Sequence, residues 1–250
     1  MPELRIIGIR GIPEVHNGDR LGTLLASGIK KIRGTLESDD VVIVTQKIVS
    51  KAEGRTVRLA SVTPSRFALD YASRWGKDAR QVELVLRESV RVVKMEHGVL
   101  ITETAHGFVC ANSGVDMSNA GEEGVALLLP KDPDASARRI RNELKQITGK
   151  SPAVIITDTF GRPWRDGQTN VAIGLAGMEA LMDYRGKRDA RGMDLRVTLI
   201  AVADELAGAS ELVMGKVDGI PAALVRGYKY NAGRGNYKDL LFKPENDLFR

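Results

Sequence analysis

The chain has 250 residues, of which 43% are hydrophobic, 28% charged and 5% aromatic, an ordinary composition for a globular protein. Its net charge of +5 suits a nucleotide or a nucleic acid, but lysines and arginines are scattered and do not alternate with aromatic residues, which argues against a nucleic-acid groove. No apolar run reaches the roughly 20 residues of a membrane span, and no secretory signal opens the chain, so we expect a cytoplasmic protein without a membrane partner.

Cys110 is the single cysteine, which excludes an internal disulfide and fits a reducing compartment. It stands in the apolar segment 108–111, with no basic residue beside it in sequence. We therefore expect a buried core residue, with a catalytic thiol as the weaker alternative.

Hydrophobic periodicity predicts short buried strands interspersed with amphipathic helices. The predicted strands cover residues 4–9, 41–44, 91–95, 99–104, 108–112, 153–156, 195–202 and 221–225, with further apolar segments at 125–130 and 171–175. The predicted helices cover residues 21–32, with Asp19 near the N-cap, then 61–75, 77–89, 135–148 and a segment ending at 214. These elements do not follow a strict βαβ rhythm, so we expect a mixed α/β (α+β) fold and not a regular doubly wound sheet.

Four polar clusters follow predicted strands, at residues 45–55, 112–122, 157–168 and 204–219. In the third cluster, Asp158 and the hydroxyl of Thr159 offer the oxygen ligands that a hard cation prefers. Arg162 and Arg165 suit phosphate or carboxylate groups, because a guanidinium can bind such anions through two parallel hydrogen bonds. Taken alone, this cluster is equally consistent with a loop that carries a surface salt bridge.

Together the four clusters offer carboxylates, amides and cations at the ends of strands. The carboxylates are Asp116, Asp158, Asp204 and Glu205, the amides are Asn112, Asn119 and Gln168, and the cations are Lys47, Lys51, Arg162 and Arg165. Carboxylates and hydroxyls select magnesium or manganese, and lysines with glycine-rich backbone can hold a triphosphate. The combination predicts metal-dependent phosphoryl chemistry, in which positioning and charge neutralisation supply most of the catalysis.

Familiar nucleotide and zinc motifs are incomplete in this sequence. The segment 148–151, TGKS, resembles the end of a phosphate-binding loop, but Leu144 stands where that motif needs a glycine. No G-x-G-x-x-G follows the first predicted strand, and His16, His97 and His106 lack zinc-ligand spacing. A P-loop, a dinucleotide fingerprint and a zinc site are therefore excluded.

Five segments carry a resemblance that spans nearly the whole chain. They are V-S-K-A-E-G-R (49–55), N-S-G-V-D-M-S-N (112–119), L-L-L-P-K-D-P-D (127–134), I-I-T-D-T-F-G-R-P-W-R (155–165) and M-G-K-V-D-G-I-P-A (214–222). In this order they resemble the coenzyme F420-0:gamma-glutamyl ligase family. The resemblance implies two interleaved α/β lobes in an intertwined homodimer, with lobe 1 at about residues 1–88 and 192–250 and lobe 2 at about 89–191.

The resemblance also implies a reaction. In that family, GTP activates the terminal carboxylate of the deazaflavin precursor F420-0 as an acyl phosphate. The amine of L-glutamate then attacks, GDP and phosphate are released, and a second glutamate is joined to F420-1 through its gamma-carboxylate. Mg2+ or Mn2+ and K+ assist, which suits a reaction that brings a carboxylate close to a triphosphate. On charge alone, Arg162 and Arg165 are candidates for binding the anionic precursor.

Two other classes of function remain open at this point. One is a metal-dependent phosphohydrolase, or a paralogous ligase that acts on another carboxylate. The other is a nucleotide-binding regulatory protein without catalysis. Glutamate-dependent phosphate release from GTP separates the ligase from both.

By position, the resemblance assigns a GTP site and two metal sites. The residues for GTP are Ile12, Pro13, Glu14, Val15, Gln46, Lys47, Lys51, Asn119 and the closing loop of Met214, Gly215, Lys216, Val217, Asp218, Gly219 and Ile220. Asp116 and Asp158 would hold the first metal ion, Thr159 would help to hold a second, and Lys51 would contact phosphate. The candidate catalytic residues are therefore Asp116, Asp158 and Lys51, although Lys51 is also consistent with a solvated ion pair.

Lys216 departs from the family pattern, because archaeal members have an acidic residue in the loop 214–220. A glutamate there could bind the second metal ion, but a lysine cannot. Either Lys216 binds phosphate, or Asp204 or Glu205 supplies the missing ligand. Gln46 and Lys47 also depart, since archaeal members have serine and threonine there, so the nucleotide contacts are expected to differ.

Overall fold

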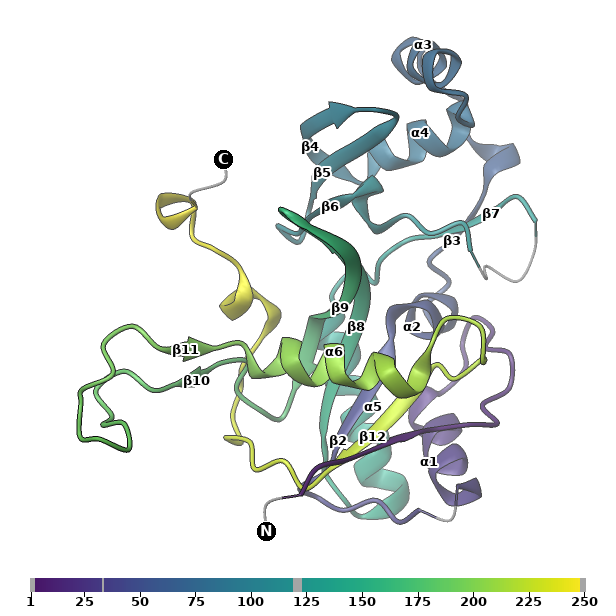
Figure 1. The fold of residues 1–250 in the computed structure, drawn as a ribbon. Coiled ribbons are helices and arrows are strands. Elements are labelled where there is room, and N and C mark those ends of the chain that lie inside the picture. The colour runs from purple at the N-terminus through teal and green to yellow at the C-terminus, as the bar shows by residue number, and fades with distance from the viewer. Residues whose placement is uncertain (1–2, 33, 119–122, 248–250) are drawn as a thin grey trace.

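A five-stranded sheet organises the larger part of the chain (Figure 1). The structure is a computed structural model, and it describes residues 3–32, 34–118 and 123–247. In spatial order the strands are β1 (Arg5–Gly8), β12 (Ala222–Arg226), β2 (Val41–Thr45), β8 (Ala153–Arg162) and β9 (Arg165–Ala176). β2 and β8 run parallel, and the other neighbours run antiparallel. The protein is thus a mixed α/β protein, as predicted.

The two parallel strands lie at the centre of the sheet because both of their faces are apolar. Residues 41–44 and 153–156 are fully buried, as continuous apolar runs in central strands usually are. Helices α1 (Leu21–Lys31) and α5 (Pro133–Thr148) pack together on one face of the sheet, and α6 (Val202–Met214) covers the other (Figure 1). Because β2 and β8 are parallel neighbours, their C-terminal ends meet at one edge of the sheet.

Local sequence signals explain how some of these helices begin and end. The side chain of Asp132 caps α5 by accepting a hydrogen bond of 2.8 Å from the Ala135 amide, and Gly149 ends it in the left-handed region. Asp19 lies next to the N-cap residue Arg20 of α1, as predicted, but its side chain accepts from the amide of His16 and closes a turn without capping the helix. Among helices of the described residues, none is both long and apolar enough to cross a membrane.

A second core lies beside the sheet and is built from the middle of the chain (Figure 1). Its elements are β3 (Thr56–Arg58), α3 (Arg66–Trp75), α4 (Ala79–Arg87), β4 (Ser89–Glu96), β5 (Val99–Thr104), β6 (Val109–Ala111) and β7 (Val125–Leu127). Tyr71, Val85, Leu100 and Leu128 are buried at its centre. The remaining helix is α2 (Gln46–Ala52), with 3-10 turns at Leu59–Ser61, Asn112–Gly114, Tyr237–Leu240 and Pro244–Asn246. The lobe boundaries near residues 89 and 192 stay a prediction.

The polar cluster 157–168 is not the loop that its composition suggests. β8 continues to Arg162, and β9 starts at Arg165, so most of the cluster forms a long hairpin whose turn includes Trp164 at φ 54°. The pairing of Phe160 with Thr169 belongs to this ladder. The segment forms a strand because its backbone hydrogen-bonds to the neighbouring strand. Its side chains do not alternate between apolar and polar, so the sequence pattern does not predict it.

The strand predicted for residues 195–202 is wrong. Only β11 (Leu199–Ile200) forms there, and it pairs with β10 (Met182–Asp183) in a hairpin that extends away from the sheet (Figure 1). Val197 is 86% exposed, so this apolar residue has no sheet or helix to pack against. A strand-like sequence forms a full strand only when a neighbouring strand or core receives it.

Candidate active site

A cleft of about 1130 Å³ brings together segments that are far apart in the sequence. It lies where the ends of β2 and β8 meet the segment 111–118, which leaves the three-stranded sheet of β4, β5 and β6. The predicted site residues that line it are Ile12, Pro13, Glu14, Val15, Lys47, Lys51, Asn112, Asp116, Asp158, Thr159, Gln168, Met214, Gly215, Lys216, Val217, Gly219 and Ile220.

The parallel pair of strands explains why the first cluster, 45–55, meets the third, 157–168. Thr45 and Thr157 are register partners at the ends of the buried parts of β2 and β8. After Thr45 the chain turns into α2, which carries Lys47 into the cleft, and after Thr157 it delivers Asp158. Parallel strands present their carboxyl ends at the same edge of a sheet, which is where ligands bind in open α/β sheets.

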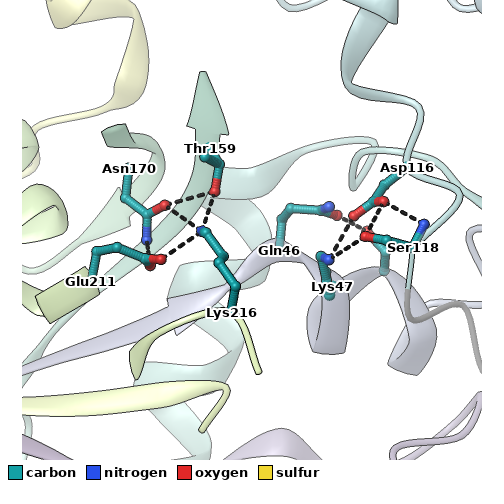
Figure 2. A network of polar contacts seen from close by, with 9 residues as sticks. Gln46, Lys47, Asp116, Ser118, Thr159, Asn170, Glu211 and Lys216 are labelled. Atoms are coloured by element: carbon teal, nitrogen blue, oxygen red, sulfur yellow. Dashed lines mark hydrogen bonds and ion pairs between the residues drawn. The ribbon is translucent and has the colours of Figure 1, made fainter. Parts of the chain in front are cut away.

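Asp116 is held by a lysine and a serine at one end of the cleft (Figure 2). Lys47 Nζ lies 2.9 Å from Asp116 Oδ2, and Ser118 donates to Oδ1 from its amide at 2.7 Å and its hydroxyl at 2.6 Å. Burial acts to raise the pKa of Asp116, but the hydrogen bonds from Ser118 and Lys47 together outweigh burial and hold the pKa below its ordinary value. Asp116 is therefore a charged carboxylate at neutral pH.

The pKa of Asp158 is shifted in the opposite direction to that of Asp116. Burial raises the pKa of Asp158 to about 7, and the negative charge of Asp116 adds to the rise. The amide of Thr159 and the ammonium groups of Lys47 and Lys216 act to lower this pKa without cancelling the effect of burial. Two converging carboxylates repel each other, so a cation placed between them would stabilise the charged form of both.

A second polar network lies on the other side of the cleft and is centred on Lys216 (Figure 2). The Lys216 ammonium donates to Thr159 Oγ1 at 2.7 Å and to Asn170 Oδ1 at 3.3 Å, and it lies 2.7 Å from Glu211 Oε1. Asn170 in turn donates to Glu211 Oε2 at 2.6 Å. The predicted metal ligand Thr159 is thus already bound by a side-chain cation.

Lys51 lies on α2 and faces the N-terminal loop, which forms one wall of the cleft. Its ammonium is 2.5 Å from Glu14 Oε1, and its side chain is 11% exposed whereas that of Glu14 is 60% exposed. Lys47 and Lys51 stand one helical turn apart on α2, so both ammonium groups reach the same cleft. The solvated ion pair considered for Lys51 is therefore present, but it stands at the cleft and not on an outer surface.

Two described residues that were predicted for the GTP site, Gln46 and Asp218, are not among those that line the cleft. Gln46 is fully buried in the first turn of α2, where its Oε1 accepts from Ser50 Oγ at 2.8 Å and its Nε2 finds no partner among the described residues. Asp218 is exposed and lies outside the cleft lining. Asn119 lies outside the described residues.

Four other polar candidates also stand outside the cleft lining. Arg162 and Arg165 are exposed near the tip of the β8–β9 hairpin. Asp204 accepts a hydrogen bond of 2.8 Å from the Ala172 amide, so it supports β9 from the first turn of α6. Glu205 is exposed. Neither carboxylate supplies the ligand that Lys216 cannot provide.

Among the polar residues that line the cleft, the sequence analysis missed Thr45, Ser118, Asn170 and Glu211. Asp204 and Glu211 are seven residues apart on α6, which places them on one face, so helical spacing could have identified Glu211. Gln168 was a candidate amide, and Asn170 lies two positions further along β9, where side chains return to the same face.

The donor set at Asp116 and Asp158 fits a divalent ion with a partly open coordination sphere. Mg2+ is usually bound by one or two carboxylates together with substrate phosphates and water, and this cleft offers two carboxylates beside two lysines. Within the described ranges, no group of three His, Cys, Asp or Glu side chains is arranged to hold a metal ion. Any further ligands would therefore come from other groups, such as a nucleotide.

Cys110 is the buried core residue that the sequence predicts. Burial raises the pKa of its thiol to about 12, and the negative charge of Asp158 adds to that rise. A thiol in this state is not a nucleophile at neutral pH. The catalytic-thiol alternative is therefore excluded.

Comparison with known proteins identifies the family to which this chain belongs. Residues 8–227 match the family model described as F420-0:Gamma-glutamyl ligase. A protein of Methanothermobacter thermautotrophicus named coenzyme F420:L-glutamate ligase is 45% identical over 250 residues, covering 99% of each chain. Proteins of the same name from Methanopyrus kandleri, at 43% identity over 100% of this chain and 99% of that one, and Archaeoglobus fulgidus, at 41% over 99% and 96%, are also similar. The chain therefore belongs to the F420-0:gamma-glutamyl ligase family.

Proposed function

We propose that this protein is a GTP-dependent ligase that joins L-glutamate to F420-0 and then adds a gamma-linked glutamate to F420-1. The names of its relatives support glutamate ligation to a form of F420. The observation that carries the proposal is the cleft itself, in which Asp116 and Asp158 stand beside Lys47 and Lys51. A carboxylate pair for a metal ion and ammonium groups for phosphate are what phosphoryl transfer needs.

The proposed reaction has two steps that balance. A carboxylate oxygen of F420-0 attacks the γ-phosphorus of GTP, the bond from that phosphorus to the β,γ-bridging oxygen breaks, and GDP leaves. The amine nitrogen of glutamate then attacks the acyl carbon, the bond to the phosphate oxygen breaks, and phosphate and a proton are released. Activation is required because a free carboxylate is a poor electrophile, and holding both reactants in one cleft makes each attack effectively intramolecular.

The residues of the cleft divide this work. Asp116 and Asp158 would hold Mg2+ or Mn2+, which screens the negative charge between triphosphate and carboxylate when it is bound. Lys51 would leave Glu14 to contact phosphate, and Lys47 adds a second positive charge close to the same place. We also propose K+ as an assisting monovalent cation.

The nucleotide would lie between the N-terminal loop and the loop that follows α6. Residues 12–15 line one wall, and residues 214–217 with 219–220 line the other, so GTP would be enclosed by segments from opposite ends of the chain. Asn119 and Gln46 remain proposed contacts, although Gln46 reaches GTP only if its buried side chain turns outward.

A cytoplasmic homodimer with interleaved lobes completes the proposal. Exposed apolar side chains on the three-stranded sheet support an interface there, among them Val90, Met95, Val99 and Val109. A homodimer has twice the 27.2 kDa mass of one chain, which light scattering measures directly.

Mass spectrometry of the product tests the ligase activity. With GTP, Mg2+ and L-glutamate, F420-0 should gain the mass of one glutamyl residue and then of a second. A phosphohydrolase would leave the mass of F420-0 unchanged while GTP is consumed, and that result would exclude the ligase.

A further inference from the structure

The Lys216 ammonium is held by oxygens from three different elements. Thr159 lies on β8, Asn170 on β9 and Glu211 on α6, and their nearest oxygens are 2.7, 3.3 and 2.7 Å from Nζ. An ammonium group has three hydrogens to donate, so this set matches its capacity. Figure 2 shows the three acceptors converging on the lysine nitrogen.

The three acceptors are also hydrogen-bonded to one another. Asn170 is 4% exposed, and its amide is oriented by bonds to both Glu211 Oε2 and Thr159 Oγ1. The Glu211 side chain is 22% exposed. A surface ion pair would join two solvated side chains, whereas here three side chains that are bonded to one another receive one cation.

The backbone directs Lys216 back towards this set. Helix α6 ends at Gly215, whose φ of 59° and ψ of −172° lie in a region that is essentially restricted to glycine. A Cβ at Gly215 would also lie 2.9 Å from a carboxylate oxygen of Asp218. The turn therefore places Lys216 beside the helix end, close to Glu211 on its last turn.

Hydroxyl, amide and carboxylate oxygens are also the ligands that a hard metal ion takes. An oxygen set of this kind needs a positive charge, and Lys216 supplies one from within the chain. The ammonium excludes a metal ion from the same position, because the two cations would compete for the same three oxygens and repel each other.

We propose that the Lys216 ammonium is a built-in cation that takes the place of a second metal ion beside Thr159. The inference rests on the proposed function for its setting, since Asp116 and Asp158 hold the first ion there. Lys216 is then a positioning residue that fixes Thr159 and Asn170 and supplies one positive charge. With Lys216 in place, each cleft accordingly binds one metal ion fewer than it would bind without the lysine ammonium.

Counting bound Mn2+ on the purified full chain tests this inference. Mn2+ is titrated into the protein, and the free ion is measured by its electron paramagnetic resonance signal. Lys216→Glu and Lys216→Ala should each bind one more Mn2+ per chain than the wild type. Lys216→Arg keeps the positive charge and should bind the same number as the wild type. Lys131→Glu, an exposed lysine outside the cleft lining, is the matched control for the change of charge.

The result is the difference in count between variants and wild type, with circular dichroism confirming that each variant is folded. A gain of one ion in Lys216→Glu or Lys216→Ala, absent from the Lys131→Glu control, supports the inference. No gain in either variant overturns it. This difference does not depend on ligase activity, so the proposed function and the role of Lys216 can fail separately.

Discussion

At the scale of single residues, the ionisation of Asp158 dominates the candidate site. The sequence pattern offers this carboxylate and Asp116 among four candidates at the ends of strands, and the family resemblance selects the two as the predicted metal ligands. It could not predict that their settings differ, with the pKa of Asp116 lowered and that of Asp158 raised to about 7. Those shifts depend on burial and on contacts with Lys47 and Ser118, which only the folded chain brings together.

Asp158→Asn should abolish metal-dependent turnover while the fold is kept. The amide has the shape of the carboxylate but lacks the charge that a divalent ion requires, so we expect a loss of at least about 100-fold in kcat/KM. Phosphate release from GTP in the complete reaction measures the loss. Asp183→Asn, which makes the same change on the exposed β10, should be as active as the wild type. An active Asp158→Asn enzyme would remove the basis of the metal assignment.

The raised pKa of Asp158 predicts how metal-free stability depends on pH. The pKa of Asp158 is about 7 in the folded chain, above its ordinary value of 3.8, so between these values the folded state binds more protons than the unfolded state. The stabilising contribution is therefore complete below about pH 4 and is lost as pH rises through 7. In EDTA, the Tm of Asp158→Asn relative to wild type should be higher at pH 8 than at pH 5. Equal differences at both pH values would contradict the raised pKa.

At the scale of elements, the sequence predicts the buried strands and the β4–β5 hairpin, but it does not predict the exposed half of the β8–β9 hairpin. β2 and the first half of β8 are short continuous apolar runs, which predict buried strands directly. The outer half of the β8–β9 hairpin is exposed, and Gly161 and Gly167 give it the composition of a loop. Pairing between strands, which composition does not encode, makes it a hairpin. The opposite error occurred at residues 195–202, where an apolar pattern lacks a core to pack against.

A register shift in the β8–β9 hairpin lies next to the site. The pairing shifts between Ile156 and Thr157, immediately before Asp158, and such irregularities often re-aim side chains beside active sites. Close to this shift, the Ala172 amide donates to Asp204 on α6. A helix thereby satisfies a backbone group of the strand at the point where the hairpin bends into the cleft.

Asp204→Ala should therefore destabilise the protein without removing a group from the cleft. The variant leaves the amide of the buried residue Ala172 without its acceptor, so we expect the free energy of unfolding to fall by about 1–3 kcal/mol. Urea denaturation measures the change. Glu205→Ala, one residue along the same helix, removes an exposed carboxylate and should leave stability within about 0.5 kcal/mol of the wild type. Equal effects of the two variants would rule out the role given to Asp204.

At the scale of the whole molecule, the cleft is assembled from segments that span residues 12 to 221. The sequence named most of its lining, because each cluster follows an apolar element and matches a family segment. It did not predict that the lining divides into two networks, one around Asp116 and one around Lys216. That division arises from the packing of α6 against β9, a contact between residues about 40 positions apart.

In the proposed reaction, GTP cleavage in this cleft is coupled to glutamate ligation. The most direct measurement is phosphate release from GTP in the complete reaction, compared with reactions that lack L-glutamate or F420-0. The proposed ligase predicts sustained release only when both are present, with one phosphate formed for each glutamate joined. Release that continues at the same rate without glutamate would contradict the claim.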